Sequence, residues 1–165
     1  MLTLGTMVVR LVLAVVLGAL VGLERELVGK EAGIRTNILV AASAALFTLA
    51  GMMMPYMVGL SRDDVTDMLI RNSGYLRIIA SVVTGIGFLG AGIIVKQRTH
   101  VTGLTTAASV WFVAALGILC GIGLSSLAAI AAVGLVALLI ILRKIDLYRL
   151  LHKKERVEKF SRDDI

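Results

Sequence analysis

Five apolar runs divide this sequence, and each is close to the length that a membrane-spanning helix needs. A helix crosses the hydrocarbon core of a bilayer with about 20 mostly apolar residues. Hydrophobic residues make up 58% of the chain, and the charged residues are gathered in short clusters instead of being spread over a soluble surface. The sequence therefore predicts an all-α, polytopic transmembrane helical bundle. The predicted spans are residues 5–24, 35–54, 76–95, 103–120 and 122–142.

Breaker residues set the expected ends of the spans. Pro55, the only proline, is expected to end the second helix because it lacks the amide hydrogen that a helix interior needs. Gly121 and Gly123 predict a tight turn between the last two spans. We therefore expect a transmembrane domain over residues 1–142 and a basic, helical cytoplasmic tail over residues 143–165. Five spans leave no room for a separate catalytic domain.

Basic residues alternate between the two sides of the predicted bundle. Cytoplasmic loops retain more Lys and Arg than external loops. The first loop, the third loop and the tail carry most of them, whereas the second loop has Arg62 and Arg71 offset by aspartates. This pattern predicts an external N-terminus and a cytoplasmic C-terminus, with the tail attracted to anionic lipids. The second loop is also expected to hold a short interfacial helix that begins with a capping box at Ser61 and Asp64.

Small residues mark the helix faces that are expected to pack. Lipid supplies no hydrophobic drive between helices, so helices in contact inside a bilayer use small residues that permit close approach. Gly18 and Gly22 stand four residues apart on the first span, and their face leads to Arg25 at its end. Arg10, about two turns from the other end, is interpreted as an anchor that snorkels to the interface.

The third span carries four glycines. Gly85 and Gly92 lie on one side of the helix, and Gly87 and Gly90 lie on roughly the opposite side. We therefore expect residues 76–111 to form the packed centre of the protein, with the third helix held between neighbours on both faces. The literal G-x-G-x-x-G spacing in this run is not a dinucleotide fingerprint, because no strand precedes it and no acidic residue follows at the required distance.

Charged residues near membrane depth are functional candidates by default. Glu24, Arg25 and Glu26 form either an ion-pair node or binding site, or a cluster that fixes the depth of the helix. Arg77 begins a polar stripe that continues with Ser81 and Thr84 on the third span. It is either a functional group or an anchor in the outer headgroups.

Hydroxyl residues surround the start of the fourth span. Thr102, Thr105, Thr106 and Ser109 recur at helical spacing. They line a polar cavity, or they bond to backbone carbonyls and neighbouring helices, which is the commoner arrangement. Trp111 falls deeper than an interfacial belt, and a packing role is expected for it. Cys120, the single cysteine, is also expected to pack as a small apolar residue.

The sequence predicts no metal site, cofactor or nucleic-acid partner. Asp63, Asp64 and Asp67 are more readily explained as first-turn helix acids than as an external magnesium sensor. His100 and His152 each lack a second zinc ligand nearby. No nucleophile and base are recognisable as a pair, so no catalytic residue and no enzyme activity are predicted.

Four segments stand in a distinctive order: GLERE at 22–26, GKEAGIRT at 29–36, IGFLGAG at 86–92 and GLTTAASVW at 103–111. Together they resemble the MgtC/SapB family of bacterial inner-membrane proteins. The resemblance implies a multi-pass membrane domain linked to survival in low magnesium, to intracellular virulence and to inhibition of the F-type ATP synthase. It also implies that such a protein works by contacting other membrane proteins and not by catalysis.

The residues and the resemblance together select two sets of positions. The functional candidates at membrane depth or at the interface are Glu24, Arg25, Glu26, Arg35, Thr36, Arg77, Thr105, Thr106 and Trp111. The expected helix-packing glycines are Gly18, Gly22, Gly85, Gly87, Gly90, Gly92 and Gly103. The chain departs from the family at Asn37, Ser81 and Thr102, where histidine, glutamine and arginine are common. Its end, about 20 residues after the last span, resembles the short SapB-like form, which lacks the C-terminal cytoplasmic domain.

Two functional hypotheses follow. The leading one is a regulatory membrane protein, a homodimer surrounded by lipid, that binds itself or a transport or ATP synthase complex through small-residue grooves. The alternative is a small ion or proton transporter in which Glu24, Arg25, Arg77 and the hydroxyls of the fourth span line a pathway.

Overall fold

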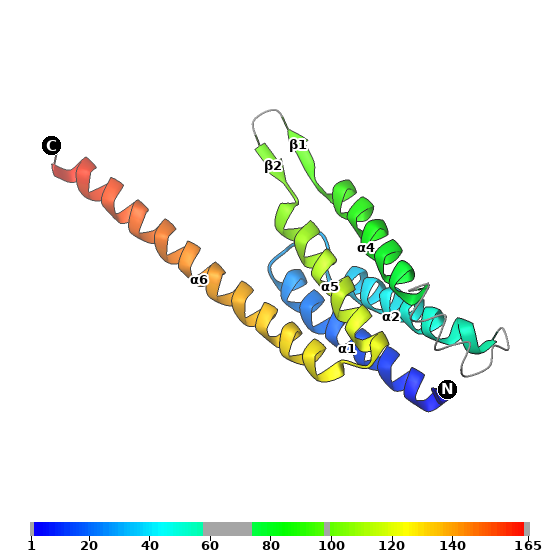
Figure 1. Ribbon diagram of the computed structural model, residues 1–165. Coiled ribbons are helices and arrows are strands. Elements are labelled where there is room, and N and C mark those ends of the chain that lie inside the picture. Colours follow the sequence, from blue (N-terminus) through cyan, green and yellow to red (C-terminus); the bar gives the residue numbers. More distant parts are fainter. Residues whose placement is uncertain (1, 58–73, 98–99, 164–165) are drawn as a thin grey trace. The chain divides into compact units, whose positions relative to one another are not determined.

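The structure, a computed structural model, describes residues 2–57, 74–97 and 100–163. Its helices are long, and Figure 1 shows one short hairpin between two of them. The elements are α1 (Leu4–Leu27), α2 (Ile34–Met57), α4 (Gly74–Ile93), β1 (Val95–Gln97), β2 (His100–Thr102), α5 (Leu104–Ile122) and α6 (Ser125–Asp163).

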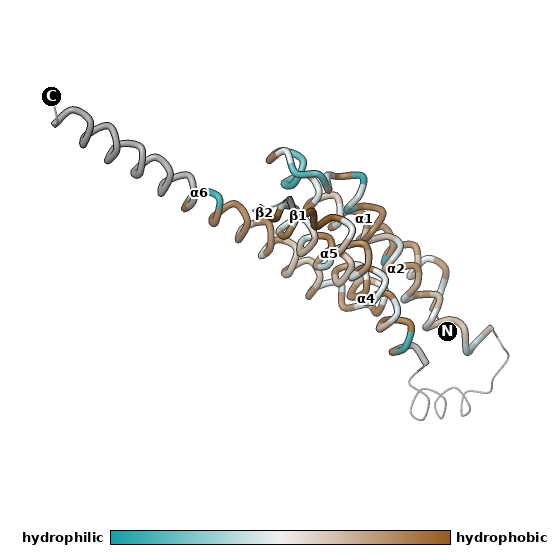
Figure 2. The backbone as a smooth tube through the Cα atoms, turned by 90° about the horizontal axis from the view of Figure 1, so that it is seen from above, coloured by the Kyte–Doolittle hydropathy of each residue, from teal (hydrophilic) through white to brown (hydrophobic). Residues whose placement is uncertain are grey.

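The predicted all-α, polytopic class is confirmed. Five helices are long and apolar enough to cross a membrane, with candidate spans at Leu4–Leu27, Ile34–Met57, Leu76–Ile93, Leu104–Ile122 and Ser125–Ile145. These agree with the five predicted runs to within a few residues. Figure 2 colours most of their length toward the hydrophobic end of the scale. Long apolar runs therefore determined the elements, as bilayer thickness requires.

The described chain forms two compact units, Met1–Ala132 and Val133–Ile165. The first unit holds α1, α2, α4, the hairpin, α5 and the first turns of α6. The second unit is the remainder of α6, which continues as one helix to Asp163, in agreement with the predicted helical tail. The predicted division after residue 142 was drawn from hydropathy and stays a prediction.

Helix α5 lies at the centre of the first unit. It contacts α1, α2 and α4, and 61% of its candidate span is buried. Its seam with α2 consists of small residues. A Cβ on Gly121 would stand 2.7 Å from Cβ of Thr48, and a Cβ on Gly117 would meet the carbonyl oxygen of Ala41. Cys120 on the same helix is fully buried as a free thiol, so its predicted packing role is confirmed.

Helix α4 was predicted to be the central helix, and this is wrong within the described chain. Only 6% of its candidate span is buried. A Cβ on Gly90 would lie 3.7 Å from Cβ of Ala107 on α5, but no described atom lies within 4 Å of a Cβ built on Gly85, Gly87 or Gly92. The physical reason is that the small residues of α5 face α2, so the closest packing is between α2 and α5. Helix α4 therefore lies at the edge.

Two local predictions also need correction. Pro55 lies inside α2, which extends to the last described residue of that segment, Met57, so the prediction that Pro55 ends the second helix is wrong. The predicted third loop contains an antiparallel hairpin that pairs Val95 with Thr102 and Lys96 with Val101. The predicted interfacial helix in the second loop lies outside the described residues.

Glycines in left-handed backbone set both ends of α5. Gly103, with φ +84°, precedes its first turn, and a Cβ there would collide with the carbonyl oxygen of Ile93. Gly123, with φ +106°, ends the helix and donates its N–H to the carbonyls of Leu119 and Cys120. Only glycine adopts this backbone without cost. The predicted turn after the fourth span is thereby confirmed.

Candidate functional site

The candidate site lies where α1 ends, the chain turns, and α2 begins. Glu26 Oε2 accepts a hydrogen bond of 2.8 Å from the backbone N–H of Ile34. This N–H belongs to the first turn of α2, where helical donors lack partners and a negative charge is favoured by the helix dipole. A Cβ on Gly33 would stand 2.6 Å from the same oxygen, so a side chain there would displace the Glu26 carboxylate. Glu26 therefore acts as a cap for α2.

Asn37 closes the turn from the other side. Its side chain is fully buried, and Nδ2 donates to the carbonyl oxygens of Ala32 and Gly33, both at 2.8 Å. Its Oδ1 atom has no hydrogen-bond partner among the described residues. This structural role of Asn37 was not predicted from the sequence. The signal that points to it is a polar residue on the face of α2 that carries Ala41, Ala44 and Ala45.

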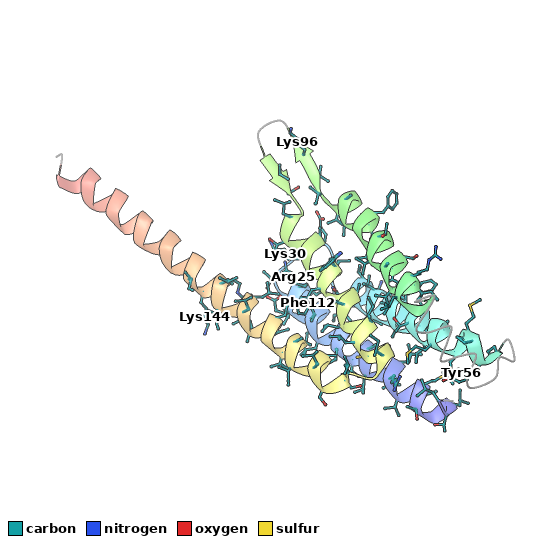
Figure 3. All side chains as sticks on the ribbon, in the orientation of Figure 1. Arg25, Lys30, Tyr56, Lys96, Phe112 and Lys144 are labelled. Carbon is teal, nitrogen blue, oxygen red and sulfur yellow. The ribbon has the colours of Figure 1, made fainter. Side chains whose placement is uncertain are left out.

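Glu24 and Arg25 form a buried ion pair. Glu24 is 8% exposed and Arg25 is 3% exposed, and Arg25 Nη1 lies 3.6 Å from Glu24 Oε2. Adjacent residues on a helix do not face each other, which explains the long distance. Glu24 Oε2 and Arg25 Nε and Nη2 have no hydrogen-bond partner in the described chain. Figure 3 shows Arg25 at the end of α1, close to the turn that carries Lys30.

The glycine face of α1 brings these groups together. A Cβ on Gly18 would stand 2.7 Å from the carbonyl oxygen of Asn37, and a Cβ on Gly22 would stand 2.6 Å from Cα of Ile34. The two helices can approach this closely only because both side chains are absent. The sequence-based expectation that this small-residue face leads to a charge is confirmed, since Arg25 follows it and is buried.

The other predicted site residues lie in several places. Arg35 is exposed and Thr36 half-buried in the first turn of α2, at the same end as the ion pair. Arg77 is exposed on α4 and lines a groove with Phe47 and other residues of α2. Glu24 and Arg25 are not part of that groove, so the structure does not bring Arg77 together with them within the described residues.

The hydroxyl groups bond mainly to their own helices. Ser109 is buried and donates to the carbonyl of Thr106 at 2.8 Å, and Ser81 donates to the carbonyl of Arg77 at 2.9 Å. Thr102 donates to the carbonyl of Val95 at 3.4 Å, so two of the four hydroxyls considered around the start of the fourth span bond to backbone carbonyls. Thr105 is exposed. Trp111 is 50% exposed, so the packing role expected for it is wrong within the described chain.

Arg10 does more than anchor α1. Its Nη1 atom donates a hydrogen bond of 2.8 Å to the carbonyl oxygen of Gly121, in the last turn of α5. A Cβ on Gly123 would stand 2.8 Å from Arg10 Cζ. A cation at a helix C-terminus is favoured by the dipole and satisfies a carbonyl that has no helical partner. Arg10 therefore joins α1 to α5.

Buried polar atoms at Glu24, Arg25 and Asn37 offer donors and acceptors to a small polar partner. Glu24 Oε2, Arg25 Nε and Nη2, and Asn37 Oδ1 have no hydrogen-bond partner among the described residues. Buried polar groups normally have partners, and unpaired ones mark sites that need an explanation. Across residues 2–57, 74–97 and 100–163, no group of three or more His, Cys, Asp or Glu residues could hold a metal ion. The arrangement offers donors and acceptors for polar binding or proton exchange.

The comparisons with known proteins agree with one another. A family model described as "MgtC family" matches residues 11–148. The chain is 43% identical over 130 residues to "Protein MgtC" of Brucella abortus strain 2308, covering 79% of this chain and 48% of that protein. It is 43% identical over 116 residues to "Protein MgtC" of Salmonella typhimurium strain LT2, covering 70% of this chain and 43% of that protein. The matched segments thus span about half the length of these relatives. No solved structure matches the chain.

Proposed function

Because this chain belongs to the MgtC family, we propose that it is a non-enzymatic regulatory protein of the bacterial inner membrane that acts by contacting other membrane proteins. In this proposal it adjusts ion or energy balance under magnesium limitation and contributes to virulence, as the family resemblance implies. The family match over residues 11–148 supports placing this role in the membrane domain.

The observation that carries the proposal is the outward face of α4. Ala80, Thr84, Gly87 and Ala91 are all exposed, and at about 100° per residue they fall within about 60° of one another. The residues of α4 that contact α2 and α5 point elsewhere. No described atom lies within 4 Å of a Cβ built on Gly87. A spanning helix therefore presents a stripe of small residues away from its own chain.

Such a stripe suits a second membrane helix. Lipid contact gives no reason to prefer small residues, whereas close helix approach does. The Thr84 hydroxyl already donates to the carbonyl of Ala80 at 2.9 Å, so the face has no unpaired hydroxyl hydrogen that would disturb an apolar contact. In our proposal the occupant is the same face of a second copy. The homodimer would then contact a transport or ATP synthase complex.

Substitution of Gly87 tests this proposal. Gly87→Leu should weaken self-association in liposomes by about tenfold or more, measured as energy transfer between donor- and acceptor-labelled copies over a range of protein-to-lipid ratios. Gly5→Leu is the matched control, because Gly5 is a glycine of α1 that also has open space around it. Equal association of wild type, Gly87→Leu and Gly5→Leu would reject the proposed face.

The proposed orientation places the N-terminus outside and the basic tail in the cytoplasm. The distribution of Lys and Arg supports it. Single cysteines at Gly29 and at Lys96 in a Cys120→Ala background should both be labelled only from the cytoplasmic side by a membrane-impermeant maleimide. Labelling of both from the outside would reverse the orientation.

A second candidate function is transport of a small ion or proton. It is favoured by the buried, incompletely paired Glu24 and Arg25, since ionisable groups held at membrane depth often lie on conduction pathways. Purified protein in liposomes should then support a pH- or ion-gradient-driven flux that Glu24→Gln abolishes and Lys96→Gln leaves unchanged. Absence of flux above empty liposomes would exclude this alternative.

A further inference from the structure

A membrane-exposed groove runs between α2 and α4. Its volume is about 390 Å³, and its lining includes Val40, Ser43 and Phe47 from α2 and Arg77, Ser81 and Gly85 from α4. The size falls within the range of pockets that hold small molecules. All but a few of its lining side chains are apolar, and both helices that form it are candidate membrane spans.

The groove lies between two close approaches of α4 to its neighbours. Near its start, a Cβ on Gly51 of α2 would stand 2.7 Å from Cδ1 of Ile78, so the helices are close there. Near its other end, Gly90 faces Ala107 of α5. Between these levels Gly85 has no described atom within 4 Å of its Cβ position. The space left open is bounded by protein on two sides and is accessible from the bilayer.

Arg77 places a cation at one end of this groove. It lies one turn after α4 begins at Gly74, on the side of the bundle where α1 begins and α2 ends (Figure 1). The adjacent Ile78 is level with Gly51 of α2, since a Cβ on Gly51 would stand 2.7 Å from its Cδ1 atom. A guanidinium on a spanning helix extends toward the headgroup boundary. In the described chain no carboxylate forms an ion pair with Arg77.

A second apolar cavity adjoins the groove. It has a volume of about 790 Å³ and shares Phe47 and Ile78 with the groove, while Met7 and Leu11 of α1 and Met53 of α2 line its remainder. Methionine and leucine side chains adapt readily to a flexible occupant. The groove and the adjoining cavity therefore meet close to the exposed guanidinium of Arg77.

We propose that the groove and the adjoining cavity together bind one anionic glycerophospholipid from the leaflet on the N-terminal side. The lipid phosphate pairs with the guanidinium of Arg77, which matches phosphate geometry with two parallel N–H donors. One acyl chain lies along Gly85 and Val40, and the other lies against Met7 and Met53. Charge complementarity at Arg77 and the shared wall at Phe47 and Ile78 identify a two-chain lipid as the occupant, in preference to a single apolar ligand. This inference is independent of the proposed role of the outward face of α4.

Spin-labelled lipids test the proposal directly. The full-length protein is placed in phosphatidylcholine bilayers with chain-labelled phosphatidylglycerol or, in parallel, chain-labelled phosphatidylcholine, and the fraction of motionally restricted label is measured. Wild type should bind phosphatidylglycerol about fivefold more tightly than phosphatidylcholine, which is the effect of one basic residue near a lipid surface. Arg77→Gln should remove that preference. Lys96→Gln, which removes one exposed positive charge from the hairpin, should keep it.

A second variant tests the apolar part of the site. Ser43 is exposed and lines the groove, so Ser43→Phe should fill the channel and reduce the restricted fraction of both lipids without a loss of core packing. Equal binding of the two lipids by wild type, or a preference that survives Arg77→Gln, would overturn the proposal. Efficient cross-linking of two copies through Ser43→Cys in a Cys120→Ala background would also overturn it, because a second chain would then occupy the groove.

Discussion

At the scale of single residues, the three charges at the end of α1 have different roles. Glu26 is exposed and caps α2 through the N–H of Ile34. Glu24 and Arg25 are buried, and their contact of 3.6 Å leaves three of their polar atoms unpaired. A buried charge without a full set of partners is costly. Glu26 therefore stabilises the fold, and Glu24 and Arg25 are the residues to test for function.

The buried ion pair should show strong coupling. Arg25→Met leaves the carboxylate of Glu24 buried without its cation and should lower the free energy of unfolding by about 3–5 kcal/mol. The double variant Glu24→Gln, Arg25→Met should lose less than the sum of the two single variants, because no unpaired charge remains. Steric trapping in bicelles gives all three values.

Arg35→Met is the control for these three variants, since Arg35 is exposed at the start of α2. Its loss should change the free energy of unfolding by no more than about 0.5 kcal/mol. If each single variant lowers the free energy of unfolding by less than about 1 kcal/mol, and the double variant loses the sum of the two, then Glu24 and Arg25 are solvated and do not interact.

Arg10 should stabilise the last turn of α5. Arg10→Met removes a charged donor from the Gly121 carbonyl and should cost about 1.5–3 kcal/mol. Hydrogen exchange should become faster at the amides of Gly123 and Leu124, which bond to the carbonyls of that turn, and stay unchanged at the start of α1. If the exchange of these two amides does not change, the hydrogen bond does not contribute to holding the helix end.

At the scale of elements, glycines on different helices have different roles, although their spacing in the sequence is similar. Gly18 and Gly22 are pressed against α2, Gly90 faces α5, and Gly87 faces away from the chain. Spacing along one helix reveals which residues share a face, but the neighbour of each face depends on how all the helices pack. The four-residue spacing of Gly117 and Gly121 is a signal for the α2–α5 seam, and an interpretation of Gly121 as a turn residue alone misses it.

The contrast between tight and open glycines makes a stability prediction. A Cβ on Gly18 would stand 2.7 Å from the Asn37 carbonyl oxygen and 2.9 Å from Cβ of Ala41, so Gly18→Ala should destabilise the fold by about 1–3 kcal/mol through overpacking. Gly5→Ala, in open space on the same helix, should instead stabilise it by about 0.5–1 kcal/mol. Thermal unfolding in detergent measures both. A Gly18→Ala protein as stable as wild type would mean that α1 and α2 are less closely packed than the structure indicates.

At the scale of the whole molecule, the sequence predicted the number and limits of the spanning helices well and their arrangement poorly. Apolar length is a local property that bilayer thickness makes decisive. The identity of the central helix is not local: α5 takes that place because Gly117 and Gly121 fit against the small residues of α2. The burial of Glu24 and Arg25 likewise required the close approach of α1 and α2. The chain belongs to the MgtC family, and the outward stripe on α4 is the contact surface that we propose for it.

Cysteine cross-linking along α4 tests the central claim most directly. In a Cys120→Ala background, single cysteines are placed at Thr84 and Gly87 on the outward face, at Gly85 in the groove, and at Gly90 against α5, and native membranes are oxidised. Disulfides form only when two Cα atoms come within about 7 Å. We expect dimers from Thr84→Cys and Gly87→Cys and none from Gly85→Cys or Gly90→Cys. Cross-linking that is strongest at Gly85 or Gly90, or equally absent at all four positions, would contradict the account.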